Sequence, residues 1–155
     1  MISMMARLFV SKNREIYDHV VLNGNCSMMR NDRITDLDTF PLCEVLEADS
    51  VIKSVDLSYN RITDQGISPI VRLLRANQMI KHISLRGNSI GEKGARELAE
   101  ALTRNRILTS LDLSENDLGE SGALSILEML KVRMRARLCT RSRFSSSCKQ
   151  FSMIM

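Results

Sequence analysis

Histidine and cysteine are the residue types whose spacing would most clearly reveal a catalytic or metal-binding site. The chain has only two histidines, His19 and His82, and four cysteines, at positions 26, 43, 139 and 148. A zinc site needs several such ligands at short spacings, and a nucleophilic thiol needs a base within hydrogen-bonding reach. The cysteines show no CxxC spacing and no histidine stands beside them. We therefore predict no enzymatic activity, no cofactor and no metal site, and expect reduced thiols in an intracellular protein.

The positive charge of the chain is concentrated at its C-terminal end. The formal net charge is +4, from 22 Lys and Arg and 18 Asp and Glu. Seven of the basic residues and none of the acids lie in residues 131–155, so residues 1–130 carry a net charge of −3. The N-terminal apolar stretch is broken by Arg7, and no apolar run approaches the ~20 residues of a membrane span. The basic character thus belongs to a tail and not to a folded core.

An internal repeat with a step of 28 residues dominates the middle of the chain. Residues 51–78, 79–106 and 107–134 align without a gap, and each aligned position keeps its chemical character. Asn60, Asn88 and Asn116 share one position, and Gly66, Gly94 and Gly122 share another. The aliphatic positions are Ile52–Ile80–Leu108, Val55–Ile83–Leu111, Leu57–Leu85–Leu113, Ile62–Ile90–Leu118, Ile70–Leu98–Ile126 and Leu74–Leu102–Leu130. Such self-similarity at a fixed period predicts a solenoid of stacked units.

Each position in the unit has a structural task. The alternation Val55-x-Leu57 predicts a short strand with one buried face, and the later spacing of three and four predicts an amphipathic helix. Between them, the asparagine carboxamides are expected to turn inward and satisfy backbone groups of the bend. We therefore interpret Asn60, Asn88 and Asn116 as a structural ladder and not as ligand-binding residues.

The pattern LxxLxLxxNxIxxxGxxxLxxxL in these units resembles the ribonuclease-inhibitor-like subclass of leucine-rich repeats. The resemblance covers Val51 to Leu130 and agrees at about eight positions in three copies. It implies an α/β solenoid with a short curved parallel sheet on the concave side and helices on the convex side. It also implies that the concave face is the binding surface.

A degenerate fourth unit precedes these three. Arg33-Ile34-Thr35-Asp36 matches Arg61-Ile62-Thr63-Asp64 at the same step, but Ser27 and Met29 are poor strand residues. Terminal units of solenoids are atypical, so this segment is expected to cap the array. The predicted domains are a lead at 1–25, helical or disordered, a repeat domain at 26–130 and a disordered basic tail at 131–155. Within the repeat domain the units are 26–50 (degenerate cap), 51–78, 79–106 and 107–130.

The exposed positions of the strands are the candidate partner-binding residues. They alternate with the buried ones and form stripes, because neighbouring strands lie ~4.8 Å apart. A solvated polar face without function is an equally weighted alternative. Arg86 is placed diagonally between Asp56 and Asp112, and Tyr59, His82 and Arg86 are the best anchors by residue type. The candidates are Ser54, Asp56, Ser58, Tyr59, His82, Ser84, Arg86, Ser110, Asp112, Ser114 and Glu115.

The leading hypothesis is an intracellular scaffold that binds a protein partner, located in the cytoplasm, with nuclear and ciliary or cytoskeletal locations as alternatives. Regulation of a GTPase, known among relatives by fold, is disfavoured because its specific loop residues are not recognisable. The basic tail supports binding to nucleic acid or an anionic surface, or a helix like a calmodulin target. A truncated or spliced product of a longer repeat protein is a further alternative. An uncapped C-terminal unit would also favour self-association through its open strand edge.

Overall fold

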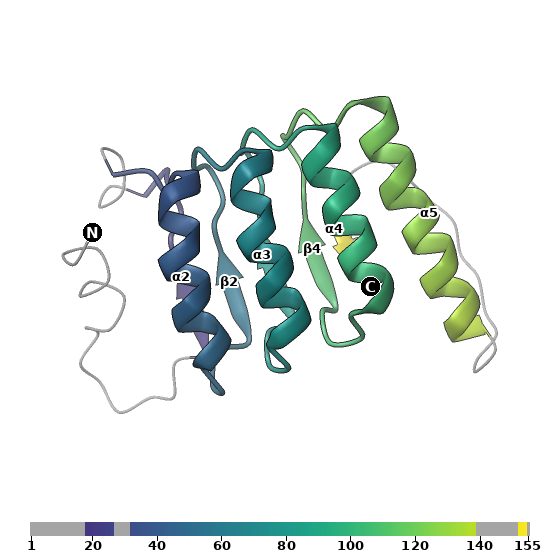
Figure 1. Cartoon of the computed structure of the whole chain (residues 1–155), viewed down its shortest axis with the longest axis horizontal. Helices are drawn as coiled ribbons and strands as arrows, with labels where there is room; N and C mark the ends of the chain where they lie inside the picture. Colours follow the sequence, from purple (N-terminus) through teal and green to yellow (C-terminus); the bar gives the residue numbers. More distant parts are fainter. Residues whose placement is uncertain (1–17, 27–31, 139–151, 155) are drawn as a thin grey trace.

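The computed structural model describes residues 18–26, 32–138 and 152–154, and side chains up to Arg133. Strands and helices alternate along it, and the helices α2–α5 lie side by side in one layer over the sheet (Figure 1). In chain order the elements are β1 (His19–Val21), α2 (Asp36–Ala48), β2 (Ser54–Asp56), α3 (Asp64–Ala76), β3 (His82–Ser84), α4 (Glu92–Arg104), β4 (Ser110–Asp112), α5 (Gly119–Leu138) and β5 (Ser152–Ile154). The predicted α/β solenoid is confirmed.

The sheet has the order β1-β2-β3-β4-β5, so each strand pairs with its neighbours in sequence. The first four strands are parallel. Val55 pairs with Ile83 and Ile83 with Leu111, which is the register that a step of 28 residues requires. A one-residue slip would turn the buried side chains out to solvent, so the apolar positions specify this register.

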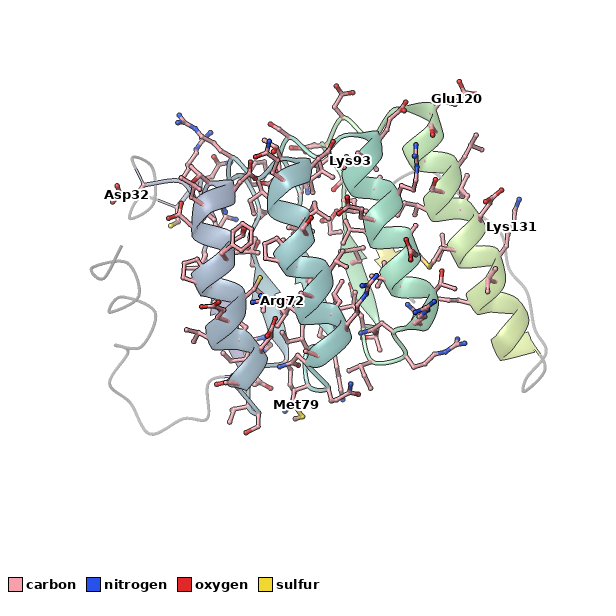
Figure 2. All side chains as sticks on the ribbon, viewed as in Figure 1. Asp32, Arg72, Met79, Lys93, Glu120 and Lys131 are labelled. Atoms are coloured by element: carbon pink, nitrogen blue, oxygen red, sulfur yellow. The ribbon has the colours of Figure 1, made fainter. Side chains whose placement is uncertain are left out.

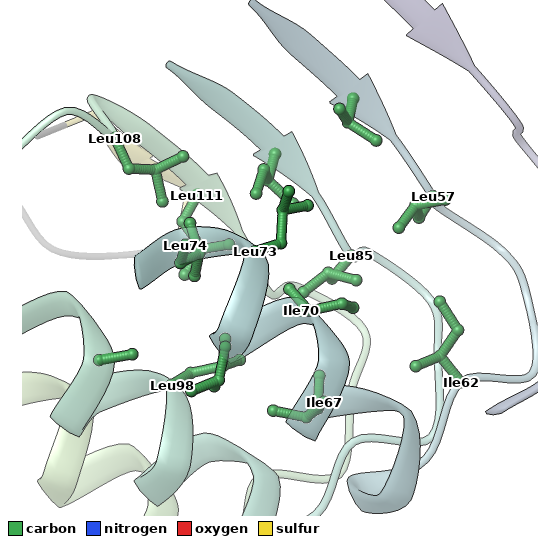
Figure 3. Close-up of a cluster of buried hydrophobic side chains, with 14 of the residues drawn as sticks. Leu57, Ile62, Ile67, Ile70, Leu73, Leu74, Leu85, Leu98, Leu108 and Leu111 are labelled. Atoms are coloured by element: carbon green, nitrogen blue, oxygen red, sulfur yellow. The ribbon is translucent and has the colours of Figure 1, made fainter. Parts of the chain in front are cut away.

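The core lies between the sheet and the helices. Side chains of the strand segments, such as Leu85, meet side chains of the helices, such as Ile70 and Leu98 (Figure 3). Burying an aliphatic side chain of this size stabilises the fold by roughly 1.5–3 kcal/mol. The largest fully buried side chains are Ile34, Leu42, Val55, Ile62, Ile67, Ile70, Leu85, Ile90, Leu98, Leu102, Leu108 and Leu111.

The first unit differs from its predicted form. Its strand is β1, which lies inside the segment expected to be a helical or disordered lead, and Val20 pairs with Val55 at a distance of 35 positions. The positions predicted for this strand, Ser27 and Met29, lie outside the described residues. The helix half follows the prediction, with Ile34, Leu42 and Leu46 buried. The first unit is therefore longer than the others by seven residues, inserted between strand and helix.

The C-terminal end also differs from the prediction. Helix α5 runs to Leu138, past the expected boundary at residue 130. Strand β5 pairs antiparallel with β4, placing Met153 opposite Leu111. The prediction of an open β4 edge is therefore wrong, because a strand from the C-terminal segment satisfies the backbone groups of that edge.

Candidate functional site

The parallel register brings the candidate strand residues into rows across β2, β3 and β4. Ser54, His82 and Ser110 pair in one row, and Asp56, Ser84 and Asp112 pair in the next. We call these six residues the strand face. The side chain of His82 is exposed and the other five are partly exposed. The structure therefore gathers them as the sequence indicates, while their contact with a partner stays a prediction.

Tyr59, Arg86 and Glu115 form a cluster at the carboxyl edge of the strand face. The Arg86 guanidinium donates hydrogen bonds to Oε1 of Glu115, from Nε at 3.1 Å and also from Nη2. The same guanidinium lies 5.7 Å from the centre of the Tyr59 ring, within the range of a cation–π contact. The sequence pointed to Asp56 and Asp112 as neighbours of Arg86, but the acid that pairs with it is Glu115.

The hydrogen bond between Arg86 and Glu115 shifts the titration of both groups. It is the largest cause that lowers the pKa of Glu115 and raises the pKa of Arg86. Both side chains are about half exposed, at 44% and 50%, so water screens the pair and its contribution to stability is small. The pair matters more because it holds a guanidinium in one place over an aromatic ring.

The backbone of this cluster is strained. Tyr59 and Glu115 have φ values of +58° and +57°, and the equivalent Gly87 has φ +64°. Glycine adopts this left-handed region freely, whereas other residues pay about 1 kcal/mol or more. A Cβ on Gly87 would lie 2.5 Å from Cδ1 of Tyr59, so only glycine leaves room for that ring. Two of the three units thus carry a larger side chain, Tyr59 or Glu115, at a position where glycine would be free of backbone strain.

Four of the candidate residues are engaged in local turns. Oδ1 of Asp56 accepts a hydrogen bond of 2.9 Å from the backbone N–H of Ser58 and another from its hydroxyl. Asp112 and Ser114 make the same two hydrogen bonds at the equivalent positions, two units further along the chain. Asn23 donates to the Ser58 hydroxyl oxygen at 2.9 Å, which extends the network to the first unit. These residues therefore also close the bend after the strand, and Ser58, which was predicted to be exposed, is buried.

The three ladder asparagines make the same set of hydrogen bonds. Nδ2 of Asn88 donates to the carbonyls of Leu57 and Leu85 at 2.9 Å, and Oδ1 accepts from the N–H of Ile62 at 3.1 Å. Asn60 and Asn116 bond in the same way to their own unit and to the preceding unit. The ladder is therefore directional, since the side chain of each asparagine bonds to its own unit and to the preceding unit, and not to the unit that follows.

A second ladder, made by the first residues of α2 and α3, was not identified from the sequence. Oδ1 of Asp36 accepts hydrogen bonds from the N–H groups of Thr63 and Gly66, at 2.7 and 3.0 Å. Asp64 bonds likewise to the N–H groups that open α4. A carboxylate at a helix N-terminus satisfies free N–H groups and complements the helix dipole. The repeated Arg-Ile-Thr-Asp at 33–36 and 61–64 was the available signal.

The described histidines do not form a catalytic arrangement. His19 lies 2.9 Å from Asp18, which also pairs with Lys53 at 3.0 Å, and His82 is an exposed strand residue. Of the residues that the structure describes, no group of three or more His, Cys, Asp or Glu side chains could hold a metal ion. Within the described ranges, no helix is long and apolar enough to cross a membrane.

A family model described as Leucine Rich repeat matches residues 49–71, 76–99 and 104–127. Each of these three segments contains one strand of the sheet and the first part of the helix that follows it. Residues 49–127 of the chain form three leucine-rich repeats. These repeats alternate one strand with one helix, as the resemblance to the ribonuclease-inhibitor-like subclass implied.

Two solved structures share the architecture of this leucine-rich-repeat chain. A structure of the actin-binding site 2 of leiomodin-1 is 28% identical with a TM-score of 0.64, covering 74% of this chain and 64% of that one. The tropomodulin C-terminal domain of Caenorhabditis elegans is 18% identical with a TM-score of 0.54, covering 70% and 66%. This second likeness shows the fold alone. The chain thus spans about two thirds of each neighbour, and no curated protein sequence matches it.

The predictions that concern the basic tail are not addressed by these findings. Residues 131–138 belong to α5 of the leucine-rich-repeat domain, and residues 139–151 lie outside the described part of the chain. Binding of nucleic acid or an anionic surface through the tail, and a truncated or spliced origin, therefore stay predictions.

Proposed function

We propose that this leucine-rich-repeat chain is a protein-interaction module whose contact surface is the strand face and the Tyr59–Arg86–Glu115 cluster. The observation that carries this proposal is the retained backbone strain at Tyr59 and Glu115. Strain of this kind persists where the surrounding structure holds it, and it concentrates at functional positions. Glycine would be the relaxed residue at both positions, and it occupies the equivalent position 87.

The chemistry of the cluster suits a binding hot spot. Tyrosine and arginine dominate the energetics of protein interfaces, and exposed polar rows around them form a suitable rim. Arg86 is held on both sides by Tyr59 and Glu115, so little side-chain freedom is lost when a partner binds. A cavity of about 660 Å³ borders Glu115 at the same edge and offers room for a partner side chain.

Actin is the candidate partner that the comparisons support. The leiomodin-1 structure is an actin-binding site, and 74% of this chain is similar to it at 28% identity. An association with actin would place the protein at the cytoskeleton, one of the expected locations. We propose no catalytic role.

Co-sedimentation with actin filaments and a binding assay with monomeric actin test this proposal. The wild-type chain should bind at least one form, and Arg86→Glu should weaken the binding about tenfold or more, as for a hot-spot residue. Arg61→Glu is the matched control, because Arg61 is exposed and lies outside the cluster. It should bind as the wild type does.

A double variant separates the binding role from the internal ion pair. Arg86→Glu with Glu115→Arg restores an intramolecular pair with its charges exchanged, so the fold should be as stable as the wild type. Binding should stay weak if the partner reads the charge at position 86. Full recovery of binding would mean that the pair acts only on the fold. Failure of the wild-type chain to bind either form of actin would overturn actin as the partner.

A further inference from the structure

The edge of the solenoid opposite the cluster carries a second pocket. It lies where α3 and α4 end and the chain returns to the strands, and its volume is about 400 Å³. Figure 2 shows Met79 at this edge, with Lys93 and Glu120 at the opposite one. The pocket is lined by Leu74, Arg75, Gln78, Ala101, Arg104, Asn105, Arg106 and Ile107.

The lining of this pocket is positively charged. Arg75, Arg104 and Arg106 contribute three guanidinium groups, and no acid belongs to the lining. Arg75 has a long and exposed ion pair with Glu100 at 4.0 Å. Among the described residues, neither Arg104 nor Arg106 has an acidic side chain within ion-pair distance. The pocket is thus a positive site on a body in which residues 1–130 carry a net charge of −3.

Helix stability explains only part of this charge. Arg75 and Arg104 lie in the last turns of their helices, where basic residues complement the helix dipole. Arg106 lies beyond Asn105, the C-cap of α4, so the dipole gives no reason for it. Helix α2 ends without any basic residue in its last turn, which shows that the fold does not require one. The arginines therefore gather at one place for another reason.

An apolar strip runs along the same edge, and its last residue, Ile107, also lines the pocket. Val51, Met79 and Ile107 are equivalent residues of successive units, and each is at least partly exposed, Val51 by 43%. The N–H of each donates to the side chain of Asp49, Asn77 or Asn105, which fixes its backbone at the start of the strand segment. The buried neighbours Leu74 and Ala101 form an apolar floor beside Ile107.

We infer that this edge binds an acidic amphipathic helix of a protein partner. Strand neighbours are about 4.8 Å apart and a helix rises about 5.4 Å per turn, so the strip can receive one apolar side chain per turn. Acidic side chains of the same helix would pair with Arg104 and Arg106, which bind carboxylates in a bidentate manner. The inference concerns a surface separate from the strand face and does not depend on actin.

Apolar contact favours a peptide over a nucleic acid. The lining contains no lysine and no aromatic ring, whereas single-stranded nucleic acids are held by stacking on aromatic side chains along a basic groove. The aliphatic floor and strip match the apolar face of a helix.

Selection of a random-sequence displayed peptide library against the full chain tests this inference. The enriched peptides should combine acidic residues with apolar residues at helical spacing. Synthetic copies of them should lose affinity by about tenfold or more for Arg104→Glu with Arg106→Glu. Arg61→Glu with Arg96→Glu is the matched control, since both residues are exposed and lie outside the pocket. Circular dichroism should show both double variants folded.

Two further measurements decide between explanations. Ile107→Ser should also weaken peptide binding, because it removes the apolar contact and keeps the arginines. Peptides without acids, or peptides that bind both double variants equally, would overturn the inference. Binding of single-stranded RNA that the Arg104→Glu with Arg106→Glu variant abolishes, in the absence of peptide binding, would overturn it in favour of a nucleic-acid site.

Discussion

The ring of Tyr59 lies so close to Gly87 that a Cβ on that glycine would come within 2.5 Å of Cδ1 of the ring. The relationship connects two successive units at the turn after the strand, where all three units have a positive φ. Gly87 relaxes the turn of its own unit and makes room for the aromatic ring of the unit before it. The cluster at Arg86 depends on this division of roles.

Glu115→Gly should raise stability and weaken partner binding. Glycine relieves the strain at φ +57°, which is worth about 1 kcal/mol, and the exposed ion pair that is lost contributes little. Urea denaturation should therefore give a higher midpoint while partner binding falls. The reverse control is Gly87→Ala, which should lower stability by about 1 kcal/mol or more. A lower midpoint for Glu115→Gly would show that the turn is not strained.

The acid ladder should stabilise the junction between units. Oδ1 of Asp64 accepts one hydrogen bond from the N–H of Gly91 and one from the N–H of Gly94, at 2.7 and 2.9 Å. Asp64→Ala should cost about 2 kcal/mol, because it leaves two N–H groups without their acceptor. Asp64→Asn keeps an acceptor oxygen and loses only the charge at the helix terminus, at a cost of about 0.5 kcal/mol. Equal losses for the two variants in urea denaturation would contradict the hydrogen-bond explanation.

The asparagine ladder should be sensitive at every position. Asn88→Ala removes one acceptor and two donors to buried backbone groups and should cost roughly 1–3 kcal/mol. Asn116→Ala should cost nearly as much, since Asn116 makes the same bonds to the unit before it and is only somewhat more exposed. Ser89→Ala, next to Asn88 and exposed, is the control and should melt like the wild type. A wild-type melting temperature for Asn88→Ala would refute the structural role.

The three regular units could be predicted from the sequence because their constraint is local and repeated. One unit cannot bury its apolar face alone, so the aliphatic positions must recur at a constant step, and the register follows. The alignment of Gly87 with Tyr59 and Glu115 is also a sequence signal of a turn with positive φ. The strain at the site could have been predicted from that alignment.

The parts that sequence reasoning missed depend on contacts that have no fixed spacing. Strand β1 was not predicted, because seven inserted residues shift it out of the 28-residue step. The ion pair of Arg86 with Glu115 was not predicted, because the torsion angles of a long side chain decide which nearby acid it reaches, and strand register does not specify them. Strand β5 is three residues long and follows a segment without periodicity, so its pairing with β4 left no trace in the pattern.

The buried thiol of Cys43 should make the fold sensitive to alkaline pH. Burial is the main cause that raises the pKa of Cys43 from 9.0 to about 12, and the nearby Glu47 raises it further. In the unfolded chain the thiol ionises once the pH exceeds its ordinary pKa of 9.0. In the folded chain it stays neutral until the pH approaches about 12. Stability is therefore complete below pH 9 and is lost as the pH rises from about 9 towards 12.

The slope of this loss can be measured. The free energy of unfolding should fall by about 1.4 kcal/mol for each pH unit in this window. Cys43→Val has a similar volume and no titrating group, so the difference between the two pH profiles isolates the thiol. Parallel profiles for the two proteins in urea denaturation would show that Cys43 ionises equally in both states.

The pairing of β5 with β4 should keep the chain monomeric. Strand β5 covers the edge of the last repeat strand, and without it the N–H and C=O groups of β4 would be open to another chain. Deletion of residues 152–155 should therefore cause self-association that light scattering detects at micromolar concentration. Met153→Pro should act in the same direction, because proline removes a backbone donor and fixes φ at about −65°.

Deletion of Met155 alone leaves all of β5 in place and is the matched control. If the full chain associates as strongly as the deletion variant, β5 does not protect the edge in solution, and the sequence-based expectation of self-association through the last unit would hold.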